Sequence, residues 1–192
     1  MNSENRQVKQ SFGTRLVVML ALSVAVEAAY CAENQRITGY VIYGQTWDAL
    51  KREMDIKGPR GFYGWTLYEI NWRYQWSETP DSCRLTSVNV DADFEIVMPE
   101  WRDRPRAGRA LQWHWRRFYD ELLEHEQQHA RMVVAGAADI RRGLTELEER
   151  ANCHQLEVEA NQLGHRILER VKRENEQFDA RTDHGRKSGT AC

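Results

Sequence analysis

Three ionisable side chains stand close together in the segment YDELLEHEQQHARMVVAG, residues 119–136. His125 and His129 are four residues apart, so a helix would place their imidazoles one turn apart on the same side. Neutral imidazoles at this spacing can bind a single metal ion, and zinc accepts their nitrogens at about 2.0–2.1 Å. Glu126 directly follows the first histidine, where its carboxylate could take a proton from a water molecule that the metal activates. These residues predict hydrolytic chemistry at a metal site.

The helical pattern around the segment predicts that these three side chains point inward. One row of the helix contains Phe118, Leu122, His125, His129, Met132 and Gly136, and the adjacent row contains Trp115, Tyr119, Leu122, Glu126, Ala130, Val133 and Ala137. A charged group among apolar neighbours needs a partner or a bound ion. The sequence HEQQH matches the HExxH motif of zinc metallopeptidases, in which the glutamate acts first as general base and then as general acid.

The residues leave the third metal ligand open. The longer pattern HExxHxxGxxH fails, because Met132 and Ala135 occupy its glycine and third-histidine positions. A ligand could instead come from the following helix or from the tail. The candidates are Glu157, Glu159, His154, His165 and His184.

The elements that must position this site change character along the chain. Residues 36–99 favour strands, with one short helix at 46–56 that begins at the capping residue Thr46. The predicted strands cover 36–44, 64–76, 84–90 and 93–99. Apolar residues then recur at helical spacing over 109–149, with a break expected near Gly136 or Gly143, and again over 152–178; residues 179–192 read as loop. This order predicts an α+β domain, a small antiparallel sheet followed by two long helices.

The first 32 residues are typical of a cleaved secretory signal. Basic residues precede the apolar run LVVMLALSVAV, and small residues follow it. The run is too short to span a bilayer, which takes about 20 residues. We expect the mature chain to begin between Ala29 and Glu33, to form a single domain over residues 33–192 without a membrane span, and to be secreted or periplasmic.

An exported chain can keep disulfides, and Cys83 and Cys153 are the two cysteines inside the expected fold. They are predicted to form a bridge, whereas Cys31 and Cys192 stand near the chain ends and stay unassigned. The net charge is −2 with both signs mixed along the chain, so nothing indicates a nucleic-acid partner.

With these features in view, the chain resembles the DUF922 family of bacterial predicted secreted zinc-dependent proteases over residues 37–189. The resemblance rests on an ordered set of segments that includes HEQQH. They are YVIYGQTWDALKREMDIKGP, GWTLYEINWRYQW, Cys83, VMPEW, WRRFYDELLEHEQQH and FDARTDHGRKSG.

The resemblance implies a zincin-like fold, one zinc ion per chain and a third ligand. The family ending Tyr-Asp-x-x-Thr-x-His-Gly corresponds here to Phe178, Asp179, Thr182, His184 and Gly185. It favours His184 over Glu157 and Glu159 as the third ligand. Phe178 departs from the usual tyrosine, so a hydroxyl group that could stabilise an oxyanion would be missing.

The sequence thus predicts an exported zinc metallopeptidase that hydrolyses amide bonds of a peptide or protein substrate. An edge strand at residues 93–99 would hold the extended substrate by strand addition, and Arg181 would polarise its carbonyl. The rival prediction is a metal-binding or envelope-associated binding protein without turnover. Four protein ligands on zinc would favour that rival, because no position would remain for water.

Overall fold

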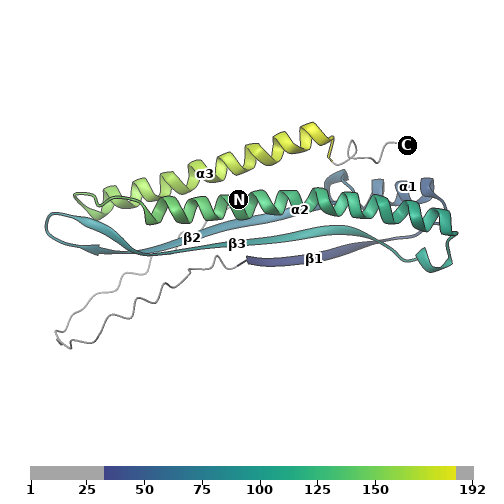
Figure 1. Ribbon diagram of the computed structural model, residues 1–192, viewed down its shortest axis with the longest axis horizontal. Coiled ribbons are helices and arrows are strands. Elements are labelled where there is room, and N and C mark those ends of the chain that lie inside the picture. Colours follow the sequence, from purple (N-terminus) through teal and green to yellow (C-terminus); the bar gives the residue numbers. More distant parts are fainter. Residues whose placement is uncertain (1–32, 185–192) are drawn as a thin grey trace, which may run out of the picture.

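The computed structural model describes residues 33–184, with side chains from residue 36 onward. In chain order the elements are β1 (Glu33–Ile42), α1 (Trp47–Lys57), η1 (Pro59–Gly61), β2 (Trp65–Glu78), β3 (Cys83–Trp101), η2 (Arg104–Arg106), α2 (Arg109–Thr145) and α3 (Cys153–Thr182). A three-stranded sheet is followed by two long helices, which confirms the predicted α+β architecture (Figure 1). The predicted signal segment, Cys31 and Cys192 lie outside the described residues. Between residues 33 and 184 there is no helix with the length and apolar character needed to cross a membrane.

The sheet is mixed, which corrects the prediction of an antiparallel sheet. Its strand order is β1-β3-β2. β2 and β3 form an antiparallel hairpin, whereas β1 runs parallel to β3 on the other side. Parallel strands need a long connection, and here α1, η1 and the whole of β2 separate β1 from β3 along the chain.

β3 is one strand of 19 residues, although two shorter strands were predicted over the same region. Buried Val90, Ala92 and Phe94 alternate with the half-buried Asp91 and Asp93, so the two-residue period continues without interruption. β3 is also the central strand, paired on both sides. Residues 93–99 are therefore not an edge strand, and the prediction that a peptide adds there is wrong.

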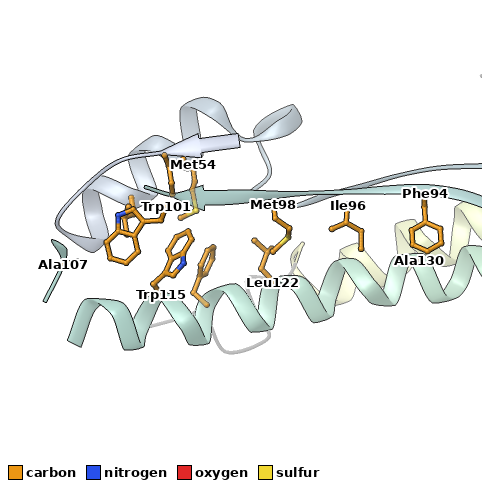
Figure 2. Packing of buried hydrophobic residues seen from close by; sticks show 12 residues of the cluster. Met54, Phe94, Ile96, Met98, Trp101, Ala107, Trp115, Leu122 and Ala130 are labelled. Carbon is orange, nitrogen blue, oxygen red and sulfur yellow. The ribbon is translucent and has the colours of Figure 1, made fainter. Parts of the chain in front are cut away.

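One face of the sheet is covered by α2, with α3 lying alongside (Figure 1). Figure 2 shows Phe94, Ile96 and Met98 projecting from β3 toward α2, where Leu122 and Ala130 meet them. A second buried cluster joins β2 to both helices and includes Ile70, Trp72, Val133, Ile140 and Val171. This packing fixes the inner row of α2, which carries the predicted site.

α2 runs unbroken through Gly136 and Gly143, where a break was expected. These glycines serve close packing of the two helices. A Cβ atom on Gly136 would lie 2.3 Å from Cγ2 of Val171, and one on Gly143 would lie 3.0 Å from Leu163. The absence of side chains at these positions lets α3 approach α2, and so brings the end of α3 to the histidines.

α3 continues to Thr182, four residues beyond its predicted end. Asp183 ends it in the left-handed conformation, with its backbone N–H donating to the carbonyl oxygen of Asp179. At the other end of α3, Cys153 forms the predicted disulfide with Cys83 at the start of β3. Asp179 therefore belongs to a helix that is covalently attached to the sheet.

Candidate metal centre

His125, Glu126 and His129 lie on the buried side of α2, as the helical pattern predicted. Their side chains belong to residues that are 5 %, 4 % and 7 % exposed. Imidazole and carboxyl groups are rarely buried without partners, so each of the three is expected to have a hydrogen-bond partner or an opposite charge nearby.

The two histidines meet a carboxylate from α3. Nε2 of His125 and Nε2 of His129 are 3.2 Å apart, and Oδ1 of Asp179 lies 3.2 Å from the first and 3.0 Å from the second. The three atoms form a nearly equilateral triangle. Among residues 36–184, His125, His129 and Asp179 are the group of His, Cys, Asp and Glu side chains arranged to hold a metal ion.

Asn175 determines which nitrogen of His129 carries a proton. Its Nδ2 donates to the carbonyl oxygen of Val171 at 2.7 Å, so its Oδ1 faces His129 and accepts from Nδ1 at 2.6 Å. In the neutral imidazole, Nε2 then carries a lone pair directed at the triangle. Nε2 of His125 and Oδ1 of Asp179 are directed at the same point, where a metal ion or a proton would satisfy all three atoms.

In the absence of a metal, a proton can take that place, and the pKa values of His129 and Asp179 reflect this. Burial opposes a charge on His129, but hydrogen bonds to Asp179 and Asn175 outweigh it and raise the pKa of the imidazole. Burial would raise the pKa of the Asp179 carboxyl, but hydrogen bonds from His125 and His129 hold it well below its usual range. In the metal-free protein the pair therefore favours an imidazolium on His129 next to an ionised carboxylate on Asp179.

A metal ion fits the same triangle. Donors bound tetrahedrally to zinc at about 2.0–2.1 Å lie roughly 3.3 Å from one another. The observed separations of 3.0–3.2 Å differ from that value by a few tenths of an ångström. Two imidazole nitrogens and one carboxylate oxygen are also a ligand set that zinc accepts.

The ring of Phe178 packs against both histidines. It stacks on His125 with centroids 4.7 Å apart and an interplanar angle of 20°, and it meets His129 edge-on at 5.2 Å. Nδ1 of His125 is buried and has no hydrogen-bond partner among the described residues. Packing by Phe178 therefore supports the ring of His125 in addition to its contact with Asp179 through Nε2.

Glu126 lies beside the start of β2. Oγ1 of Thr66 is 2.8 Å from Oε2 of Glu126 and 3.1 Å from the backbone carbonyl oxygen of the same residue, so the hydroxyl can donate to either. Gly64 borders the same carboxylate, since a Cβ atom there would lie 2.7 Å from Oε1. Burial raises the pKa of Glu126, although its hydrogen bond with Thr66 and the nearby imidazoles oppose the shift. A carboxyl group with a raised pKa is suited to general base and acid work near neutral pH.

These groups open into one cleft of about 270 Å³. One wall comes from the loop before β2 and the first residues of that strand, the other comes from α3, and the histidines and Glu126 of α2 line it as well. The wall residues are Arg60, Phe62, Gly64, Trp65, Thr66 and Tyr68 on one side and Lys172, Asn175, Glu176, Asp179 and His184 on the other. The buried donors thus remain accessible to a ligand.

His184 lies next to the triangle and not inside it. Its Nδ1 is 3.6 Å from Oδ1 of Asp179, its side chain is 41 % exposed, and its ring contacts Phe62 at 4.4 Å. The structure thus brings it to the cleft, as the family ending implied. Its role as a ligand stays a prediction.

The alternative ligands from the start of α3 lie far from the cleft. His154 is exposed in the first turn, and Glu159 forms an ion pair with Arg150 at 2.6 Å. At 1.5 Å per residue, His154, Glu157 and Glu159 are about 30–38 Å from Asp179 along the helix axis. Arg181 is exposed in the last turn of α3 and does not line the cleft, whose cationic residues are Arg60 and Lys172.

Sequence reasoning missed Asp179, Asn175 and Thr66. Asp179 belongs to the family ending but was assigned to a loop, where its direction could not be inferred. A useful signal was the spacing of Val171, Asn175, Phe178 and Asp179, which continues the helical period of α3 toward the inner side. Thr66 offered no signal, because its contact with Glu126 depends on how the sheet packs on α2.

A family described as bacterial protein of unknown function (DUF922) matches residues 37–185. The chain belongs to the DUF922 family. The match includes every residue of the triangle as well as Glu126, Asn175 and His184. No curated protein and no solved structure matches the sequence of this DUF922 chain.

Proposed function

We propose that this DUF922 protein is a zinc-dependent hydrolase that cleaves amide bonds in peptides. The observation that carries the proposal is the convergence of His125 Nε2, His129 Nε2 and Asp179 Oδ1 in a cleft that Glu126 also lines. His125, His129 and Asp179 would hold the metal, and Asp179 replaces His184 as the proposed third protein ligand. Zinc, when bound, would supply an acidified water molecule and polarise the substrate carbonyl.

The residues of the chain account for the proton transfers. Glu126 would accept a proton from the attacking water and deliver it to the leaving amine. Thr66 holds one carboxylate oxygen at 2.8 Å, which limits the directions that the carboxylate can take. Asn175 keeps the proton of His129 on Nδ1, so that Nε2 remains free to bind the metal.

The substrate would lie along β2 and not along residues 93–99, the segment that the sequence suggested, because those residues belong to the central strand β3. Within the described chain β2 pairs with β3 alone, and its first residues form one wall of the cleft. An extended peptide could therefore contact the open edge of β2 while its scissile bond faces α2. The Cys83–Cys153 disulfide supports an exported location, secreted or periplasmic, since such bonds persist in oxidising compartments.

His184 favours the second candidate function, a metal-binding protein without turnover. Its imidazole is 3.6 Å from Asp179 and could rotate to become a fourth protein ligand. A site closed by four protein ligands has no position for water, and zinc would then stabilise the fold only.

One set of variants distinguishes the two functions. The zinc content of the purified mature chain is measured by elemental analysis for wild type, His129→Ala, Asp179→Ala and His184→Ala. For a hydrolase we expect about one zinc per chain in wild type and His184→Ala, and a loss in the other two. Peptide cleavage should then fall by about 10²–10⁴-fold in Glu126→Gln, with zinc retained. Zinc lost in all three variants, together with no cleavage, would support the closed site, and absence of zinc from wild type after reconstitution would contradict both functions.

A further inference from the structure

A row of stacked side chains extends from the metal centre along one wall of the cleft. His184 contacts the ring of Phe62 at 4.4 Å, and Phe62 stacks on Trp65 at 5.3 Å with an interplanar angle of 20°. The guanidinium of Arg60 lies over the Trp65 ring at 5.0 Å. Arg60 thus ends a row whose inner end, His184, lies 3.6 Å from Asp179.

Arg60 has a backbone conformation that disfavours its side chain. Its φ of 54° and ψ of 22° are left-handed, and the following residue, Gly61, also has a positive φ of 82°. Glycine adopts this region without steric cost, whereas a side chain with a Cβ atom does not. A glycine at position 60 would therefore satisfy the turn better than arginine does. Strain of this kind at a cleft wall points to a use for the side chain.

The charge of Arg60 is available to a ligand. Within residues 36–184 the Arg60 guanidinium has no carboxylate within 4.0 Å, and it makes a cation–π contact with the Trp65 ring. Stacking on an indole limits the motion of a guanidinium and leaves its N–H donors free at the edge. Lys172 on the opposite wall also lacks such a partner, but Glu176, one turn farther along α3, lines the cleft with it. The end of the cleft at Arg60 is therefore the more positive one.

We infer that Arg60 and the Phe62–Trp65 stack form a subsite for a carboxylate-bearing part of the substrate, beyond the metal centre on the His184 side. The inference rests on the proposed function and specifies its substrates as acidic peptides. The contacts between successive members of the row measure 4.4–5.3 Å. The carboxylate would thus be within about five residues of the scissile bond, at about 3.3 Å per extended residue. An aspartate or glutamate side chain and a free chain terminus share this chemistry.

Binding can test the subsite without any turnover. Immobilised, zinc-loaded Glu126→Gln mature chain is exposed to two degenerate octapeptide libraries, one with free and one with amidated C termini. Retained peptides are sequenced by mass spectrometry. We expect one of two results, each with an enrichment of about tenfold. Either aspartate and glutamate are enriched over asparagine and glutamine, or peptides with a free C terminus are retained over those with an amidated one. Enrichment in both libraries identifies an acidic side chain, whereas enrichment confined to the first identifies the terminal carboxylate.

Substitution of Arg60 tests which residue is responsible. Arg60→Gly, made in the Glu126→Gln background, suits the observed backbone and should fold, and its melting temperature checks this. We expect the enrichment ratio to fall toward one in this variant. The matched control is Arg173→Gln, which removes an exposed cation of α3 that does not line the cleft, and it should keep the ratio. Equal retention of acidic and amide peptides by the parent protein, or a preference that survives Arg60→Gly, would overturn the inference.

Cleavage of the same libraries by the zinc-loaded wild type is scored separately. A preference for acidic peptides in binding, without cleavage, would support the subsite and contradict the proposed hydrolase. Cleavage without acidic preference would contradict the subsite and support the hydrolase.

Discussion

Nδ1 of His129 donates to the side-chain oxygen of Asn175, 2.6 Å away, across the interface between α2 and α3. This hydrogen bond connects the metal centre to the packing of the helices, because Asn175 is also anchored to the carbonyl oxygen of Val171. Val171 in turn lies against Gly136, where a Cβ atom would be 2.3 Å from it. The tautomer of a proposed ligand therefore depends on a close contact between two helices.

Asn175→Ala should weaken zinc binding by about 10–100-fold, because His129 loses the acceptor that orients its ring. The affinity is measured by competition with a chromogenic chelator. Gln177→Ala, at an exposed position of the same helix, is the control and should bind zinc like the wild type. An unchanged affinity in Asn175→Ala would show that packing alone orients His129.

Gly64→Ala should reduce peptide cleavage by about 100-fold and leave zinc binding intact. The added Cβ would be 2.7 Å from Oε1 of Glu126, so the carboxylate must move, and displacements of about 1 Å can have this effect on rate. Gly108→Ala is a suitable control, since no atom lies within 4 Å of a Cβ there. Zinc loss in Gly64→Ala would mean instead that the substitution disturbs the whole centre.

Glu126→Gln should stabilise the metal-free protein at pH 8. Burial raises the pKa of Glu126, so the ionised group destabilises the fold above the unfolded pKa of about 4.3, and glutamine can still bond to Thr66. We expect the melting temperature of the variant to exceed that of the wild type at this pH. The gain should vanish near pH 4, where the wild-type carboxyl is protonated too. A gain that persists unchanged at pH 4 would have another cause.

The metal-free protein should be more stable at pH 5.5 than at pH 8. His129 has a raised pKa, so its contribution is complete below its unfolded pKa of about 6.5 and is lost as pH rises through the folded value. Asp179 has a lowered pKa, so its contribution is present above about 3.9 and is lost as pH falls further. Calorimetric melting of chelator-treated protein at both pH values checks this order.

Zinc should reverse that dependence. Binding requires the imidazoles to lose their protons, so the rise in melting temperature on adding zinc should be larger at pH 8 than at pH 5.5. Asp179→Asn should remove most of the difference between the two pH values in the metal-free protein. Equal zinc effects at both pH values would contradict protonation of the centre.

Replacing both Cys83 and Cys153 by serine should lower the free energy of unfolding by about 2–4 kcal/mol, because the bond closes a loop of 70 residues. The zinc content should stay near that of the wild type. Cys153 is about 39 Å from Asp179 along α3, at 1.5 Å per residue. Denaturant unfolding and elemental analysis on the same sample test both statements, and zinc loss from the folded variant would contradict the second.

The sequence predicted those features that depend on local periodicity. The inward side of α2 followed from helical spacing, and the antiparallel pairing of β2 with β3 from the residue types of the strands. The Cys83–Cys153 bridge followed from the position of both cysteines inside the expected fold. The parallel pairing of β1 did not, because no local pattern distinguishes parallel from antiparallel neighbours when helices and turns intervene. Asp179 was missed since the end of α3 was placed four residues early, and the direction of a side chain is inferred only inside a regular element.

Gly136 illustrates how one residue type can mislead. A glycine in a helical pattern indicates a break when the chain is considered alone. In the folded protein Val171 of α3 packs against Gly136, and α2 continues through this position. Such contacts depend on tertiary packing, which a single sequence does not display.

The disulfide and the candidate metal centre connect α3 to the rest of the fold at opposite ends, and the two depend on different conditions, oxidation for one and metal supply for the other. If the proposed ion is lost, the change is confined to the last turns of α3, while the bridge still holds the first turn against the hairpin. Loss of a bound ion would therefore be a local event at one end of α3, and the rest of the fold would stay in place. If the protein is exported and zinc-dependent, as proposed, it would remain folded but inactive in a metal-poor environment and bind the ion when it returns.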